Sequence, residues 1–126
     1  MRFTRTGAIL WTENYEECVH FYSRILGLRV MHTLDNEHSK LTCCDMGGES
    51  YLMIETGGKS IPKGKTLDQN PVWLRFNVED VEAAAAELRK KGVSVNIRWE
   101  VWGTVADFVD PDGNCCSLRD EATFEP

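Results

Sequence analysis

The sequence predicts an α+β protein built from two βαβββ modules. Three observations predict this fold: a strand–helix–three-strand order occurs twice, turns rich in glycine and proline separate the elements, and an offset of 66 residues (80 − 14 = 66) places the helix start at Asn14 on that at Asp80. The chain has 126 residues, the length of one domain. We therefore expect a single domain with module 1 at about 1–56, a linker at 57–70 and module 2 at about 71–121.

In module 1 a strand is expected at 4–11 and a helix at 14–27. The apolar side chains of that helix recur at helical spacing, Asn14 and Glu17 resemble a capping box, and Gly27 is a suitable end. Strands follow at 28–34, 40–46 and 50–56, separated by polar and glycine-rich turns. The next segment, up to residue 71, is rich in Gly, Pro and Lys, which predicts a linker or a mobile loop.

Module 2 repeats this order. A strand is expected at 71–78 and a helix at 80–92 that begins at Asp80 and ends at Gly92. Three more strands are predicted at 94–101, 103–109 and 114–120. The sequence Asp-Pro-Asp-Gly-Asn at 110–114 predicts a tight hairpin turn, because proline fixes φ and glycine accepts a positive φ.

Charge and composition exclude several classes of partner. Fourteen basic and twenty acidic side chains give a net charge of −6, which disfavours nucleic acid and anionic membranes as partners. No apolar run is long enough for a signal peptide or a membrane span, so a cytoplasmic protein is expected. The five cysteines include two adjacent pairs, whose side chains point to opposite strand faces, and we expect reduced, buried thiols.

Three segments carry a resemblance to a known family: Phe21-Tyr22 with Leu26-Gly27-Leu28, FNVEDVEAAAAELRKKG at 76–92, and VWGTVADFVDPDGN at 101–114. Together they resemble the vicinal oxygen chelate superfamily, which includes glyoxalase I, extradiol dioxygenases and the bleomycin- and fosfomycin-resistance proteins. The resemblance covers nearly the whole chain. It implies that the two curved mixed sheets enclose a cavity (the glyoxalase/bleomycin-resistance fold) and that the protein forms a homodimer.

Side chains alternate across a strand, so each strand has one face under the helix and one facing the cavity that the resemblance implies. We expect Leu52 and Ile54, Val72 to Val78 at alternate positions, and Cys116 and Leu118 to lie under the helices. The opposite faces, with the tryptophan beside the last hairpin, provide the candidate ligand-binding residues: Trp11, Tyr51, Met53, Glu55, Trp73, Arg75, Trp102, Ser117 and Arg119. Aromatic and arginine side chains together favour a planar or anionic organic ligand.

The resemblance also implies a position for a metal ion. Enzymes of that superfamily hold one divalent ion through four side chains, usually His or Gln, Glu, His and Glu, and the corresponding positions here are Gly7, Glu55, Trp73 and Ser117. Glycine has no side-chain donor, the Trp N–H has no lone pair, and a serine hydroxyl is a weak ligand. We therefore expect no metal ion and no other cofactor, and we expect His20, His32 and His38 not to form an alternative site.

These observations predict a metal-free, dimeric protein that binds a small organic molecule, with antibiotic sequestration as one such role. In it Trp side chains would stack on the ligand, Arg would pair with an anionic group, and Glu55 would accept hydrogen bonds or pair with a cation. One alternative is a lyase, isomerase or dioxygenase-type enzyme with an unusual metal site around Glu55, or with Glu55 as a general base. Another is a structural or regulatory module whose cavity is filled by Trp73 and which binds no ligand. Cys115 is a weaker candidate nucleophile, whose pKa the nearby Arg119 could lower.

Overall fold

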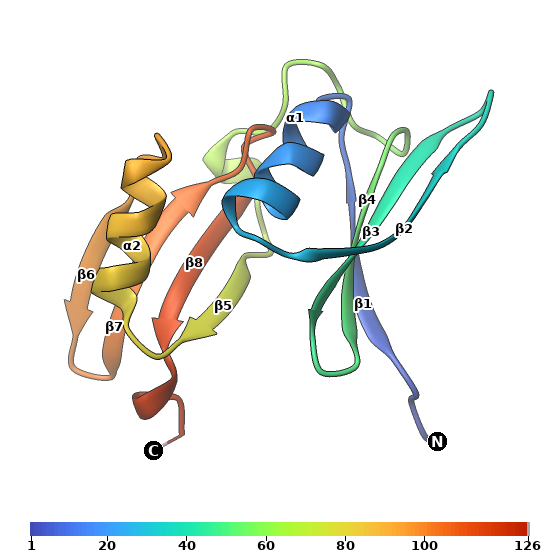
Figure 1. Cartoon of the computed structure of the whole chain (residues 1–126). Coiled ribbons are helices and arrows are strands. Elements are labelled where there is room, and N and C mark those ends of the chain that lie inside the picture. The colour runs from blue at the N-terminus through green and yellow to red at the C-terminus, as the bar shows by residue number, and fades with distance from the viewer. Residues whose placement is uncertain (126) are drawn as a thin grey trace. The chain divides into compact units, whose positions relative to one another are not determined.

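The computed structural model describes residues 1–125, and the chain divides into two compact units, one spanning residues 1–64 and the other starting at Lys65. Each unit contains one four-stranded sheet and one α-helix, which Figure 1 shows in chain order. In each sheet one pair of strands is parallel and two pairs are antiparallel. The predicted α+β fold with two βαβββ modules is thereby confirmed.

The first unit contains β1 (Thr6–Trp11), α1 (Tyr15–His20), a π-helical turn (Phe21–Ile25), β2 (Arg29–Asp35), β3 (Lys40–Gly47) and β4 (Ser50–Glu55). Its strand order is β1-β4-β3-β2, with β1 parallel to β4. The predicted single helix therefore changes from α to π geometry after its sixth residue. Leu52 and Ile54 are fully buried as predicted, together with Tyr22 from the π-helical turn.

The second unit contains β5 (Leu74–Val78), α2 (Val81–Lys90), β6 (Asn96–Glu100), β7 (Gly103–Val109) and β8 (Cys115–Asp120). Two short 3-10 turns, Leu67–Gln69 and Glu121–Thr123, flank these elements, and the strand order is β5-β8-β7-β6. The helix packs on β7 and β8 and buries Val81, Ala85 and Leu88. No helix among residues 1–125 is both long and apolar enough to cross a bilayer.

The starts of the two helices differ from each other. Asp80 caps α2, since its side chain accepts a hydrogen bond from the Ala83 N–H at 3.0 Å. The Asn14 side chain makes no such bond to α1 and instead donates to the Pro62 carbonyl at 3.2 Å. The capping box predicted for Asn14 and Glu17 is therefore wrong, because the asparagine amide holds the connecting segment.

The prediction that Val72 packs under the second helix is also wrong. The strand β5 begins only at Leu74, and the Val72 side chain is 68% exposed. A side chain replaces the missing strand pairing here, because Asn70 Oδ1 accepts the Cys115 backbone N–H at 3.1 Å. Trp73 therefore lies just before the strand, 43% exposed.

The turn at 110–114 forms the predicted hairpin and is held by a buried carboxylate. Asp110 accepts hydrogen bonds from the Asp112 N–H, the Asn114 N–H and the Asn114 side-chain amide at 2.7 to 2.9 Å. Gly113 has a φ of +85°, the left-handed region that favours glycine. A Cβ atom at Gly113 would lie 3.0 Å from the Lys65 carbonyl carbon, so this glycine also permits the close approach of the connecting segment.

The connecting segment, predicted as a linker or mobile loop, has fixed contacts at both ends. In the first unit, Glu13 Oε1 accepts hydrogen bonds from Gly57 N at 3.2 Å and from Ser60 Oγ at 2.9 Å. In the second unit, the Lys65 N–H donates to the Asp112 carbonyl at 2.7 Å, and the Lys65 ammonium pairs with the buried Asp112 carboxylate. Each unit thus holds its own end of the segment.

Candidate functional site

The face of each sheet opposite its helix is called the open face below. In the first unit the β1–β4 register places Gly7 beside Tyr51, Ile9 beside Met53 and Trp11 beside Glu55. Trp11 therefore lies on the same face as Tyr51, Met53 and Glu55, as its place among the candidate ligand-binding residues requires. Ile9 and Trp11 are almost half exposed, so this face presents apolar and aromatic side chains with Glu55 at one end.

Two glycines allow aromatic rings to lie flat against the backbone of this unit. A Cβ atom at Gly7 would lie within 2.5 Å of ring atoms of Tyr51, and one at Gly58 would meet the Trp11 indole at a similar distance. The Tyr51 ring therefore fills the space that a side chain at residue 7 would need, and the Trp11 ring lies against the connecting segment.

The positions that correspond to the metal ligands of the similar family do not suit a metal ion. Gly7 offers no donor and its space is taken by Tyr51. Glu55 pairs in register with Trp11 rather than with Gly7, and it is the one position of this pair that carries a donor atom.

The corresponding pair in the second unit is also unsuitable. Trp73 offers no lone pair, and the fully buried Ser117 hydroxyl accepts a hydrogen bond from Arg75 Nε at 2.9 Å. A cationic guanidinium against the serine disfavours a metal cation at that position. Among residues 1–125, no three His, Cys, Asp or Glu side chains are grouped so as to hold an ion. His38 Nε2 lies 3.4 Å from Glu37 Oε1, and both side chains are exposed.

The open face of the second unit carries a row of polar side chains. The register places Arg75 beside Ser117 and Ser117 opposite Asp107. Asp107 Oδ2 accepts a hydrogen bond from Arg98 Nε at 2.7 Å, and Arg98 Nη1 pairs with Glu100 at 3.0 Å. The sequence analysis predicted Arg75 and Ser117 but not Asp107 and Arg98, although the alternation along 94–101 and 103–109 places both on this face.

A pocket of about 520 Å³ lies at the end of this sheet. Its lining comes from the β6–β7 turn, from β8 and from the C-terminal segment: Val101, Trp102, Arg119, Ala122, Thr123, Phe124 and Glu125. The Arg119 guanidinium lies 4.9 Å from the centre of the Trp102 ring and 5.8 Å from that of Phe124. We call this the Trp102 pocket.

Arg119 both lines and holds the Trp102 pocket. Its Nη2 donates to the carbonyls of Trp102 at 3.0 Å and Thr123 at 2.8 Å, which ties the β6–β7 turn to the C-terminal 3-10 turn. The guanidinium of Arg75 also lies 6.0 Å from the Trp102 ring. The structure thus brings together three predicted residues. Sequence reasoning missed Phe124, because no periodic pattern covers the last residues.

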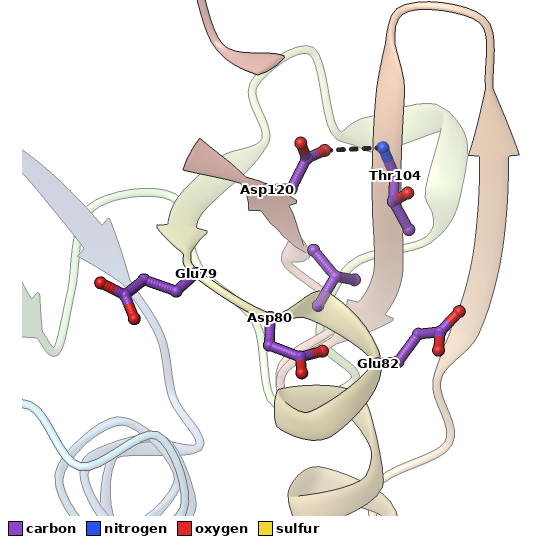
Figure 2. A pocket seen from close by; sticks show the side chains of 6 residues that line it. Glu79, Asp80, Glu82, Thr104 and Asp120 are labelled. Atoms are coloured by element: carbon purple, nitrogen blue, oxygen red, sulfur yellow. Dashed lines mark hydrogen bonds between the residues drawn. The ribbon is translucent and has the colours of Figure 1, made fainter. Parts of the chain in front are cut away.

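A second, smaller hollow of about 270 Å³ is strongly acidic (Figure 2). Glu79, Asp80, Glu82 and Asp120 line it around the start of α2. Most of these carboxylates have structural partners: Asp80 caps the helix, Glu82 accepts the Trp99 indole N–H at 2.9 Å, and Asp120 accepts the Thr104 N–H at 2.7 Å. Hydrogen bonds from Thr123 and from the Thr104 N–H hold the pKa of Asp120 below its usual value.

The five cysteine side chains are buried thiols, as expected. Burial raises the pKa of Cys43, and raises that of Cys44 to about 11. Burial also raises the pKa of Cys115, and the nearby carboxylates of Asp110 and Asp107 raise it further. The suggestion that Arg119 lowers the pKa of Cys115 is therefore wrong, and the arrangement does not favour a nucleophilic thiolate there.

Comparison with known proteins assigns the family. The model of the Glyoxalase/Bleomycin resistance protein/Dioxygenase superfamily matches residues 4–117, and the chain belongs to this superfamily. The protein is similar to SMU.1112c, whose crystal structure shares 25% identity with a TM-score of 0.78, covering 94% of this chain and 98% of that one. A search of curated proteins gave no match.

Two further solved structures share the fold but have different described roles. The antibiotic-binding protein TnmS3 from Streptomyces sp. CB03234 is 24% identical, with a TM-score of 0.74 and coverage of 95% of this chain and 96% of that one. The trypanothione-dependent glyoxalase I of Leishmania major is 23% identical, with a TM-score of 0.77 and coverage of 98% and 89%. At these identities the likeness concerns the fold, so the function has to be argued from the site.

Proposed function

We propose that this protein binds a planar or charged organic molecule without a metal ion or other cofactor. The observation that carries this proposal is the Trp102 pocket, whose volume of about 520 Å³ is typical of small-molecule sites. Two aromatic rings flank the Arg119 guanidinium there, an arrangement that suits stacking on a planar ligand. The antibiotic-binding relative TnmS3 adds support for a sequestering role.

The alternative, an enzyme of the lyase, isomerase or dioxygenase type, has less support. Its usual chemistry needs an ion with an open coordination position, and the four corresponding positions supply one good donor, Glu55. Glu55 as a metal-free general base remains testable by its replacement with Gln, which would abolish a bell-shaped pH–rate profile.

The remaining predicted residues belong to the same proposal. We propose that Trp11, Tyr51, Met53 and Glu55 on the first open face, and Trp73 before β5, also contribute to ligand binding. Exposed apolar side chains on the first open face, with Leu34 on the edge strand β2 of the same sheet, support a second copy of this chain as the partner that covers them. The acidic composition and the burial of all five thiols support a location in the cytoplasm.

The proposal can be tested with Nile red, an uncharged planar dye whose fluorescence rises on transfer to an apolar site. We expect saturable binding to chelator-treated protein, and a Trp102→Ala variant should bind the dye more weakly by about 1–3 kcal/mol, with Trp73→Ala showing a loss of the same order. Trp99→Ala is the matched control, because the Trp99 side chain bonds to Glu82, does not line the pocket and is not one of the proposed ligand-binding residues.

Circular dichroism should show that all three variants fold. Equal dye affinity in Trp102→Ala and the unaltered protein would contradict the pocket assignment. A requirement for added divalent metal would contradict the metal-free proposal and favour the enzyme alternative. Native mass spectrometry of the same preparation reports bound metal, a co-purified organic molecule and the number of subunits.

A further inference from the structure

The Arg75 guanidinium on the second open face is held in place but has no anionic partner. Its Nε donates to Ser117 Oγ at 2.9 Å, and its Cζ lies 6.0 Å from the Trp102 ring. Within residues 1–125 no carboxylate lies within 4.0 Å of this side chain, although the chain has twenty acidic residues. Its two terminal nitrogens are therefore available to an anion, in the fork geometry that carboxylates prefer.

Asp107, on the neighbouring strand, has a buried oxygen atom without a hydrogen-bond donor. Its Oδ2 bonds to Arg98, while Oδ1 is inaccessible to solvent and has no partner within the described chain. A buried carboxylate oxygen without a donor costs free energy, so such atoms normally have a partner. The Ser117 side chain stands between the two groups, because its residue pairs with Arg75 on one side and Asp107 on the other.

From these two groups we infer the chemistry of the ligand: an aromatic molecule that carries both an acidic group and an N–H or O–H donor. The acidic group pairs with the terminal nitrogens of Arg75, the donor bonds to the Asp107 carboxylate, whose side chain is 20% exposed, and the ring lies near Trp102. The Arg75 guanidinium sits over β8 and Asp107 on β7, and neighbouring strands are about 5 Å apart, so both groups fit on one small ring system. This inference rests on the proposed function and specifies its ligand class.

Three probes separate the contributions of charge and donor. Indole-3-acetate carries a carboxylate and a ring N–H, 1-naphthaleneacetate keeps the carboxylate without the N–H, and indole-3-acetamide removes the charge. Isothermal titration calorimetry should show indole-3-acetate binding about 10- to 100-fold more tightly than the amide, the range expected for a hydrogen-bonded charge. It should also bind more tightly than the naphthalene acid, by several-fold.

Variants assign these preferences to residues. Arg75→Met should abolish the preference for acid over amide, whereas Arg24→Met, an exposed arginine in the first unit, should retain it. In Asp107→Asn the amide oxygen should accept from Arg98 and the NH2 group should face the ligand, so the preference for the ring N–H should be lost while the preference for the acid is retained. Thermal unfolding of each variant shows whether it folds, and Asp107→Ser provides a second test at that residue if the amide disturbs Arg98.

Each result bears on one of the two proposals. Equal affinity for acid and amide, or a preference that survives in Arg75→Met, overturns the inferred ligand class while Nile red binding still supports the pocket. If Nile red binds and none of the three probes does, the ligand class is again overturned. If neither the dye nor any probe binds, the proposed function itself fails, and the inference fails with it.

Discussion

The contact between Gly7 and Tyr51 predicts that the effect of Gly7→Ala on protein stability changes sign with the residue at position 51. In Gly7→Ala the new Cβ would lie within 2.5 Å of the Tyr51 ring, at least 0.9 Å closer than the 3.4 Å of ordinary contact (3.4 − 2.5 = 0.9). The ring must move, and overpacking of this kind typically costs about 1–3 kcal/mol. Alanine also lowers the entropy of the unfolded chain, which stabilises by about 0.4–1 kcal/mol.

The expected net result for Gly7→Ala is a loss of up to about 2.5 kcal/mol in the free energy of unfolding. In a Tyr51→Ala background the same change meets no ring, so it should instead stabilise the protein by up to about 1 kcal/mol. Tyr51→Phe keeps the ring and is the matched control, in which Gly7→Ala should remain destabilising. Urea unfolding of the double-mutant cycle gives the coupling energy between the two residues.

A stabilising Gly7→Ala in the unaltered protein, or the same effect in all three backgrounds, would refute this reasoning. The result also bears on the ligand position of the family. If the ring excludes even a methyl group at residue 7, a metal-binding side chain could not be accommodated there without displacing Tyr51.

Two further predictions concern ionisation. Because the folded-state pKa of Asp120 lies below its usual 3.8, its contribution to stability is present above that pH and is lost as the pH falls through the folded-state value. Urea midpoints measured from about pH 6 to about pH 2 should therefore fall less steeply at the acidic end in Asp120→Asn than in the unaltered protein, and parallel curves would contradict the assignment. The pKa of Cys44, raised from 9.0 to about 11, reduces its thiolate fraction about 100-fold at neutral pH, so iodoacetamide should alkylate Cys44 only after denaturation, as read by peptide mass spectrometry. Rapid labelling of Cys44 in the folded protein would show that this thiol is exposed or activated.

The sequence was informative wherever a local pattern determines structure. The alternation of side chains identified the buried Leu52 and Ile54, because a one-residue shift would expose both. The helix start at Asp80 was also predictable, since its capping bond joins residues three apart in sequence. These features depend on short-range geometry, which the order of residues alone specifies.

Long-range contacts limited the prediction elsewhere. Asn14 looks like a capping residue in sequence, but its amide bonds to Pro62, 48 positions away. Phe124 joins the Trp102 pocket because Arg119 ties the C-terminal turn to the β6–β7 turn. The pKa of Cys115 is raised by burial and by the carboxylates of Asp110 and Asp107. The alternation of side chains along a strand does not predict that these two carboxylates lie near the thiol. In each case the decisive partner lies outside the local pattern.

The contacts that Glu13 and Asp112 make with the connecting segment show where the chain could be interrupted without breaking a described hydrogen bond or ion pair. Every hydrogen bond and ion pair cited above has both partners on the same side of the Gly64–Lys65 peptide bond. Each unit therefore contains its own βαβββ module together with the contacts that hold its end of the connecting segment. A break of the chain after Gly64 would therefore leave each of these contacts intact within one fragment or the other.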